Sequence, residues 1–394
     1  MAAATRRMAG MGAAAAGMLL IAATYGMARF GVGLFAPAIA ESRPGLIGIL
    51  GWAAAAQFAA YCVAALAAAR LADRHPRTGL ILAGATAAAG CVGIAVATDP
   101  AVFVISVLVG GMGGGFASPA LVPVIDAVVP RASAASAQSV ANAGTATGVI
   151  GAGLVAFTPL SVGSAWTLMA VVCALATVAA WYPVRRRTDL GRHALSNPAE
   201  GAGAGMRALL VPAGASLVVG AGSSLAWTFG PLLVTDARTV AAEQVGWLWI
   251  VLGLGGFLGA FAGRLVDRTG LHGGWWACSL ALALATAGVA VAVGTGGAWA
   301  AYAGMAVFGA GYMGMSGILI LWARAVRPSS AGAGTSVLFI SLAVGQAAGS
   351  AGFGAAMDLI GPVFPAAAAA VLCAAGGAVV LAGRRTAAAV EAAT

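Results

Sequence analysis

Residues 70–74 read RLADR, and residues 264–268, which lie 194 positions later, read RLVDR. The same offset joins three further identical pairs, Gly26 and Gly220, Phe35 and Phe229, and Pro37 and Pro231. Later in each half the offset becomes 198, as for Gly111 and Gly309, Ser118 and Ser316, and Pro130 and Pro328. An offset that holds over most of the chain with one small slip indicates an internal repeat. The sequence therefore predicts two homologous halves.

The composition excludes a soluble protein. Of the 394 residues, 61% are hydrophobic and 8% are charged, and the mean hydropathy is +0.98. A soluble domain carries about 25% charged residues, so this chain lacks the polar groups to cover a water-facing surface. We predict an all-α integral membrane protein with twelve transmembrane helices, because each span needs about 20 apolar residues. The expected helices lie at about residues 11–40, 46–69, 79–97, 101–123, 139–157, 164–183, 208–232, 245–262, 274–294, 299–321, 331–356 and 363–382.

These helices fall into two sets of six, which we expect to form two pseudo-symmetric bundles. The N-terminal bundle is expected at 1–183 and the C-terminal bundle at 208–394. The stretch between them, 184–207, is rich first in Arg and then in Gly, Ala and Pro, as is typical of a linker. The first apolar run is too long for a removed signal peptide and lacks a clear cleavage site, so we interpret it as a permanent span.

All 20 basic residues are arginines, and 17 of them fall on one side of the twelve expected spans. The positive-inside rule assigns that side, with both termini, to the cytoplasm of a multi-pass protein in the cytoplasmic (plasma) membrane. The net charge of +9 is then explained by topology, and we expect no nucleic-acid partner.

The loop between the second and third expected helices reads ARLADRHPRT at residues 69–78. It resembles the signature G-x-x-x-D-R-x-G-R-[RK] of the major facilitator superfamily. Asp73, Arg74 and Arg77 match this signature, whereas Ala69 and Pro76 replace its two glycines. The copy at 263–270, GRLVDRTG, keeps Gly263, Asp267, Arg268 and Gly270. The resemblance implies a secondary transporter with two six-helix bundles, a substrate site near the bilayer midplane and an alternating-access mechanism.

Two patterns of the proton-coupled drug exporters in this superfamily are absent. The fourth expected helix, VLVGGMGGGFASP at 107–119, lacks their arginine. In the fifth, GTATGVIGAG at 144–153, Val149 stands where those exporters carry proline. Both departures weigh against a multidrug or antibiotic efflux antiporter, which nevertheless stays open as the alternative function.

Glycines spaced three or four residues apart predict helices that approach one another closely. They are Gly144, Gly148 and Gly151; Gly255, Gly259 and Gly263; and Gly345, Gly349 and Gly352. Two interpretations are compatible with this pattern, namely plain packing and a seam on which the halves move.

The family resemblance also implies a cytoplasmic charge latch. In it, Asp73 faces the start of the eleventh helix, Arg77 pairs with Asp126, and Asp267 pairs with Arg324. The signature residues Arg74 and Arg268 belong to the same gate. The alternative is that these are ordinary interfacial charges.

A single charged residue, Arg29, lies within an expected span, in the segment TYGMARFGVGLFAP at 24–37. A charge at that depth costs at least about 2.5–3.5 kcal/mol. Its repeat equivalent is Ser223, no acidic residue falls mid-span, and the three histidines lie in expected loops. Three roles stay open: binding an anionic substrate group, a structural role satisfied by carbonyls, water or rings, and replacing or tuning a coupling cation. Candidate neighbours on cavity-lining faces are Tyr25, Gln57, Tyr61, Asn142, Thr145, Ser223, Trp227, Tyr312, Ser316 and Gln346.

We therefore predict a secondary active or facilitative transporter of a small organic solute, with an anionic or amphipathic substrate favoured. The partners expected are that solute and the lipid bilayer, and the expected state is a monomer. No cofactor or metal is expected, because the five cysteines show no metal-ligand spacing and a P-loop requires lysine, which the chain lacks. A membrane enzyme is disfavoured by the lack of buried acids and histidines, and a sensor by the lack of a signalling domain.

The topology is testable by cysteine labelling. In a variant without native cysteines, one introduced within 190–200 should react only from the cytoplasm, and one within 236–240 only from outside, because positive charge is retained inside. A membrane-impermeant maleimide applied to intact cells and to inside-out vesicles measures this. Labelling of both regions from the same side would refute the two-bundle topology.

Overall fold

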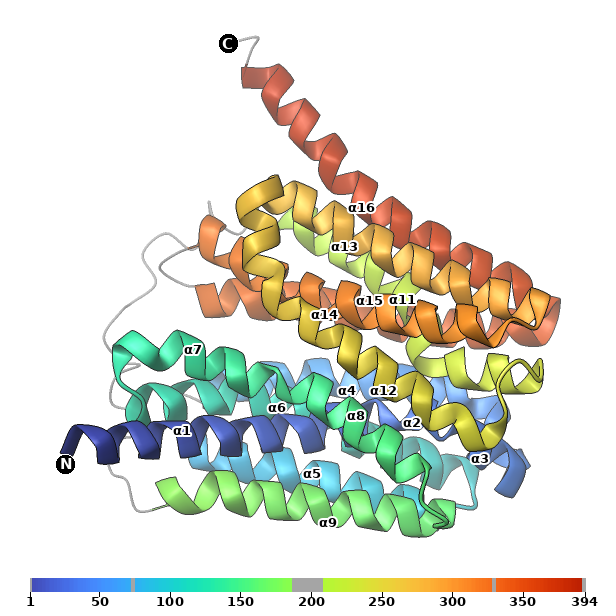
Figure 1. Ribbon diagram of the computed structural model, residues 1–394, viewed down its shortest axis with the longest axis horizontal. Coiled ribbons are helices and arrows are strands. Elements are labelled where there is room, and N and C mark those ends of the chain that lie inside the picture. Colours follow the sequence, from blue (N-terminus) through green and yellow to red (C-terminus); the bar gives the residue numbers. More distant parts are fainter. Residues whose placement is uncertain (1, 72–74, 186–207, 328–330, 392–394) are drawn as a thin grey trace. The chain divides into compact units, whose positions relative to one another are not determined.

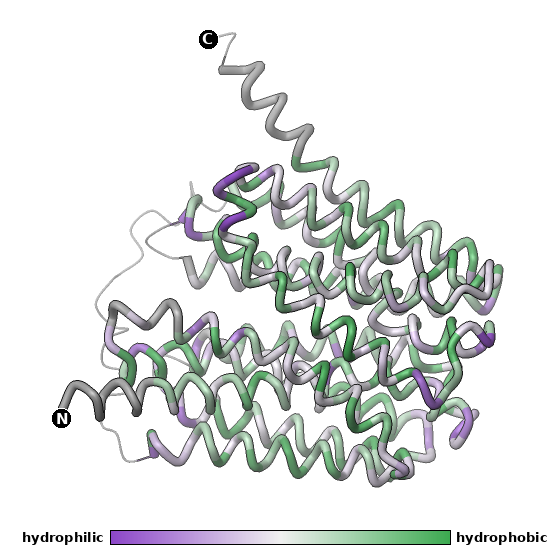
Figure 2. The backbone as a smooth tube through the Cα atoms, viewed as in Figure 1, coloured by the Kyte–Doolittle hydropathy of each residue, from purple (hydrophilic) through white to green (hydrophobic). Residues whose placement is uncertain are grey.

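The computed structural model describes residues 2–71, 75–185, 208–327 and 331–391, and within them every regular element is a helix. The chain divides into two compact units, Met1–Pro198 and Ala199–Thr394 (Figure 1). The expected linker lies largely outside the described residues, so the proposed bundle boundaries stay a prediction. Figure 2 shows hydrophobic residues along the helices and hydrophilic ones gathered at the helix ends, as expected for membrane spans.

Within the described residues, the first unit has nine α-helices and three short helices of other types. In chain order they are α1 (Ala2–Ile21), the π-helix η1 (Ala22–Arg29), α2 (Gly31–Leu34), α3 (Ala36–Ser42), η2 (Pro44–Ile49), α4 (Leu50–Leu71), α5 (Pro76–Val96), α6 (Pro100–Val128), α7 (Arg131–Asn142), α8 (Gly144–Ala156), α9 (Val162–Trp181) and η3 (Tyr182–Val184). The expected first helix, 11–40, is thus interrupted. The fifth is broken between α7 and α8 at Ala143.

The second unit follows the same order with fewer interruptions. Its elements are α11 (Leu210–Asp236), η5 (Ala242–Gln244), α12 (Val245–Gly256), η6 (Phe257–Phe261), α13 (Ala262–Thr295), α14 (Ala298–Val326), α15 (Ala331–Ile360) and α16 (Val363–Glu391).

Twelve membrane spans are present in the described residues. Eleven helical stretches are long and apolar enough to cross a bilayer, and one of them, Ala242–Thr295, has 54 residues. Such a length exceeds what a bilayer of about 30 Å accommodates in one crossing. Gly270 breaks it with φ of 72°, a left-handed conformation that glycine adopts without the steric cost of a side chain. This stretch therefore forms two spans, and the predicted all-α fold with twelve helices is confirmed.

Backbone contacts at glycines recur in the two units. In the first, a Cβ atom at Gly144 or Gly148 of α8 would overlap the backbone of α1 and η1. In the second, a Cβ at Gly345 or Gly349 of α15 would overlap the backbone of α11 in the same way. The sequence repeat is therefore a repeat of tertiary contacts, in which the first and fifth helices of each unit pack at backbone distance.

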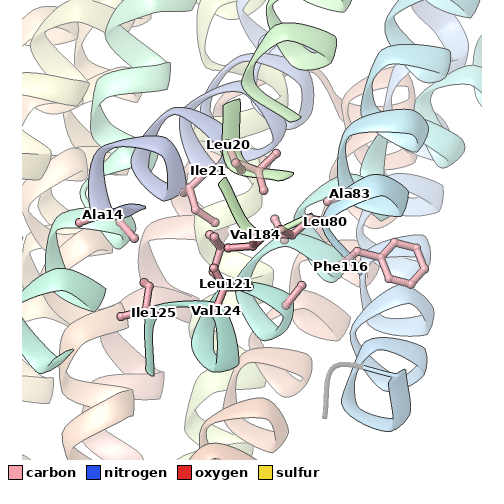
Figure 3. Packing of buried hydrophobic residues seen from close by; sticks show 14 of the residues in the cluster. Ala14, Leu20, Ile21, Leu80, Ala83, Phe116, Leu121, Val124, Ile125 and Val184 are labelled. Atoms are coloured by element: carbon pink, nitrogen blue, oxygen red, sulfur yellow. The ribbon is translucent and has the colours of Figure 1, made fainter. Parts of the chain in front are cut away.

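Apolar packing joins α1 to other helices of the first unit. Leu20 and Ile21 from α1 meet Leu121 and Val124 from α6, and Val184 of η3 closes this cluster (Figure 3). All five side chains are buried. The cluster fixes the helix that leads directly into η1 and hence the position of Arg29.

Arg43 caps the C-terminal end of α5 in this unit. Arg43, between α3 and η2, donates from Nη1 to the carbonyls of Ile94 (2.7 Å) and Ala97 (2.8 Å), and from Nη2 to that of Ala95 (2.7 Å). The last carbonyls of a helix have no intrahelical partner and carry the negative end of its dipole. Arg43 thus caps α5 and ties it to the segment after η1.

Two glycines of α8 give a matched test of this packing. Gly148→Ala should lower stability by about 1–3 kcal/mol, because its Cβ has no room against η1. Gly151→Ala should be neutral or stabilising by up to about 1 kcal/mol, because its nearest neighbour is the flexible Met27 side chain at 3.7 Å. Melting temperatures in detergent measure both. Equal shifts would contradict backbone-distance packing at Gly148.

Candidate functional site

Arg29 is the last residue of the π-helix η1. The wide turn is closed by the bond from the Phe30 N–H to the Tyr25 carbonyl, at 3.2 Å, which spans five residues. Gly26 sits in this turn, and a Cβ there would lie 2.5 Å from the Gly148 carbonyl carbon. Single-turn π segments are frequent at functional sites. The wide turn lets η1 pack against α8. The same segment, η1, carries Arg29.

The guanidinium of Arg29 lies among four aromatic rings. Its Cζ is 4.3 Å from the ring centroid of Tyr61, 4.9 Å from Phe58, 5.1 Å from Phe30 and 5.2 Å from Tyr25. The Tyr25 and Tyr61 rings also meet edge to face at 5.8 Å. Cation–π contacts are worth about 0.5–1 kcal/mol each when exposed and about 2 or more when desolvated. Arg29 is only 3% exposed, so we name these four rings with Arg29 the ring cage.

The cage leaves hydrogen-bond donors unused. The Nε of Arg29 is buried and makes no hydrogen bond within the described part of the chain. The same holds for Nε2 of Gln57, which is also buried. Gln57 lies one helical turn before Tyr61 on α4, and residues four apart share a helix face. Every Asp and Glu whose side chain the structure describes is exposed, so none of these carboxylates meets the Arg29 charge.

Three glycines of α6 make room for this site. A Cβ at Gly114 would lie 2.9 Å from the Tyr25 ring, and one at Gly115 would lie 2.6 Å from the Tyr61 carbonyl oxygen. At Gly111 it would lie 2.5 Å from the Gln57 carbonyl oxygen. The glycine run in GGMGGG at 110–115 was the available sequence signal for these contacts. This run carries no predicted role, and Phe30 and Phe58 are not among the predicted neighbours of Arg29.

A second aromatic cluster lies in the second unit, around Trp227 of α11. Its ring meets Tyr312 at 5.2 Å, Phe308 at 5.3 Å and Trp249 at 5.9 Å, each edge to face. Gln346 of α15 donates from Nε2 to the Tyr312 hydroxyl at 3.1 Å, and both residues are buried. Three of the predicted neighbours, Trp227, Tyr312 and Gln346, are therefore joined in one unit, as Arg29, Tyr25 and Tyr61 are in the other.

The remaining predicted neighbours bond locally or stand apart. Ser223 donates to the Gly220 carbonyl at 3.0 Å, and Ser316 to the Tyr312 carbonyl at 3.0 Å. Asn142 is exposed and accepts from Gln138 at 3.3 Å. Thr145 is half-buried on α8. Local bonds to a preceding helical turn satisfy a hydroxyl without a ligand.

The predicted gate residues are only partly described. Asp73 and Arg74 lie outside the described residues. Arg77 donates from Nη1 to the Arg185 carbonyl at 2.9 Å, which ties the start of α5 to the end of η3. Asp126, Asp267, Arg268 and Arg324 are all exposed. The latch pairs stay predictions.

The Gln346–Tyr312 bond can be tested by stability. Tyr312→Phe should cost about 1–3 kcal/mol, because it leaves a buried amide donor without its acceptor. Adding Gln346→Leu should recover part of this loss. The matched control is Tyr302→Phe on the same helix, whose hydroxyl makes a longer, exposed contact of 3.5 Å with Gln244 and which should be nearly neutral. Equal melting temperatures for Tyr312→Phe and wild type would show that this bond contributes nothing.

Comparisons with known proteins agree with this architecture. The sequence matches the family description "Major Facilitator Superfamily" over residues 18–350, whereas a search of curated proteins gave no match. The fold is similar to a crystal structure of the nucleoside transporter NupG, with a TM-score of 0.71, 12% identity, and 95% of this chain and 97% of that chain covered.

It is also similar to the partially occluded inward-open xylose transporter XylE from E. coli, with a TM-score of 0.72, 13% identity, and 94% of this chain and 96% of that chain covered. Identities this low bear on the fold alone. The family match, the twelve spans and the repeated glycine contacts agree, and the chain belongs to the major facilitator superfamily of membrane transporters.

Proposed function

We propose that this transporter moves a small organic anion by alternating access, and that Arg29 binds the anionic group. The observation that carries the proposal is the ring cage, which holds a buried guanidinium whose Nε has no hydrogen-bond acceptor among the residues that the structure describes. A cation kept at membrane depth without a carboxylate partner is a functional site by default.

A guanidinium makes different contacts at its faces and at its edge. Aromatic rings contact its faces, whereas its five N–H donors point outward in its plane. A carboxylate or phosphate binds that edge with two parallel hydrogen bonds, and Nε supplies one donor of such a fork. The rings therefore hold the charge and leave the edge for an anion. The buried Nε2 of Gln57 provides a further donor in the same region.

The apolar surroundings favour an amphipathic substrate. Four rings around Arg29 and three around Trp227 give two aromatic surfaces, each combined with a few polar groups. Sites for small organic molecules have this mixture of apolar lining and sparse polar groups. A carboxylate or phosphate attached to an apolar or aromatic body fits the residue types available.

A second candidate function is supported by the same rings. If their faces alone compensate the charge of Arg29, the arginine is structural, and an efflux transporter for neutral or cationic drugs follows. The unused Nε donor weighs against this alternative, because buried polar groups in proteins are nearly always hydrogen-bonded.

The arginine distribution supports placement in the cytoplasmic membrane with both termini inside. We also propose that Asp73, Arg77 and Asp126, with Asp267 and Arg324, close the cytoplasmic side. Exchange, facilitated diffusion and coupling through the ionisation of the substrate are all compatible with spans that have no acidic residue near their middle.

The test is a series of variants at Arg29. A thermal-shift screen of organic anions against neutral and cationic compounds first identifies a ligand. Arg29→Ala should then weaken binding of that ligand at least about 30-fold, because removing one member of a buried charge pair costs about 2–5 kcal/mol. Arg29→Lys should weaken it less, since it keeps the charge but loses the planar fork. Affinity and transport in proteoliposomes are the measurements.

The control is Ser223→Ala, the repeat equivalent of Arg29, which should bind as wild type does. If Arg29→Ala transports at the wild-type rate, the proposed binding role is wrong. If it melts far below wild type with affinity intact, Arg29 is structural and the second candidate function holds.

A further inference from the structure

A recess of about 340 Å³ lies at one end of a membrane span in the second unit. It is lined by Phe261, Arg264, Leu265 and Arg268. Arg264 and Leu265 each lie three or four residues from both Phe261 and Arg268, so the four residues form one face of the helical run through η6 and the start of α13. Gly270 ends this run two residues later. The two arginines therefore stand in the last turns of the span, where it leaves the apolar region.

The same face continues into the span as an exposed apolar stripe. Its members are Leu254, Phe257, Leu258 and Phe261, of which Leu258 is 59% and Phe261 48% exposed. The other side of this run carries Gly255 and Gly259, where a Cβ would overlap the backbone of α14. The glycine side is thus packed, whereas the apolar stripe is uncovered. In a membrane span, an uncovered apolar face meets acyl chains.

The positive charge at the end of the apolar stripe comes from Arg264 and Arg268. The Cζ of Arg264 lies 5.1 Å from the centroid of the Phe261 ring, and Arg268 follows one helical turn later. Asp267 is exposed between them and offsets one of the two charges, which leaves the face cationic. One face of the Arg264 guanidinium rests on the ring, and its edge is left to bind a phosphate as a fork. Figure 2 shows the hydrophilic turn at the start of α13 next to hydrophobic helix.

We propose that this face is a binding site for an anionic phospholipid. Arg264 and Arg268 bind the headgroup phosphate, and the acyl chains lie along the stripe from Phe261 to Leu254. The apolar stripe selects a lipid over a soluble phosphate, which has no group to cover it. Each Arg near an anionic membrane surface contributes about 1 kcal/mol. The site is separate from the ring cage and does not depend on the proposed substrate.

The repeat supplies the control for this proposal. Arg70 is the equivalent of Arg264 at the offset of 194, and it is likewise exposed at the end of its span. At the position equivalent to Phe261, however, the first unit has Ala67, which cannot support a guanidinium. Arg70→Gln therefore removes the same charge without touching the proposed site.

The experiment uses the full chain in detergent micelles doped with phosphatidylglycerol or, separately, phosphatidylcholine. Phosphatidylglycerol should raise the melting temperature and remain bound in native mass spectra, whereas phosphatidylcholine should do neither. Arg264→Gln should weaken phosphatidylglycerol binding about fivefold and the double change with Arg268→Gln more. Arg264→Lys should weaken binding less than Arg264→Gln does, because it keeps the charge but loses the planar fork, and Arg70→Gln should leave binding unchanged.

Three results would overturn the proposal. They are equal stabilisation by phosphatidylcholine, an equal loss on Arg70→Gln and on Arg264→Gln, and full stabilisation by inorganic phosphate alone. The first would indicate a general lipid effect, the second unspecific charge attraction and the third a soluble anion site. If the double variant does not fold, Arg264→Lys and Phe261→Ala test the same contacts, and wild-type binding by Phe261→Ala would contradict the role of the ring.

Discussion

A charge buried at membrane depth is costly unless it is compensated, and much of the first unit is arranged around the compensation of Arg29. Rings of Tyr25, Phe30, Phe58 and Tyr61 face Arg29. These rings need space, which glycines of α6 provide by letting α4 and the Tyr25 ring approach. The π turn of η1 sets the direction in which the arginine points. A side chain added at one of those glycines would therefore disturb the charge as well as the packing.

The two units share a scaffold but differ in chemistry. Backbone contacts between the first and fifth helices recur at glycines in both. At the variable positions they diverge: Ser223 replaces Arg29, and Tyr312 stands at the offset of 198 from Gly114. In the first unit Gly114 makes room for the ring of Tyr25, which comes from another helix. In the second unit Tyr312 places its own ring at the position equivalent to Gly114. A duplicated bundle thus retains its close helix contacts while its polar groups change independently.

The spans and their repeat follow from the sequence, because hydropathy and a constant offset are local properties of the chain. The contacts around Arg29 do not follow from the sequence. Phe30 and Phe58 are ordinary apolar residues in an apolar sequence, and only tertiary contact turns them toward the guanidinium. The π turn is equally hidden, since it depends on how η1 meets Gly148. Ser223 and Ser316 were plausible lining residues, but each bonds a carbonyl of its own helix.

Arginine stands at every position where the chain has a Lys or Arg. The edge and the faces of the guanidinium make different kinds of contact in this structure. Arg43 uses its edge: three of its five N–H donors bond carbonyls at the end of α5, and the role is structural. Arg29 uses its faces, which meet rings, and its Nε donor is unoccupied. Arg264 has one face on Phe261 at an exposed helix end. Rings compensate charge but accept no in-plane hydrogen bond of this kind. An arginine held by rings therefore keeps an in-plane donor that an arginine held by carbonyls has used, and this open donor is the reason why we propose an anion as the ligand of Arg29.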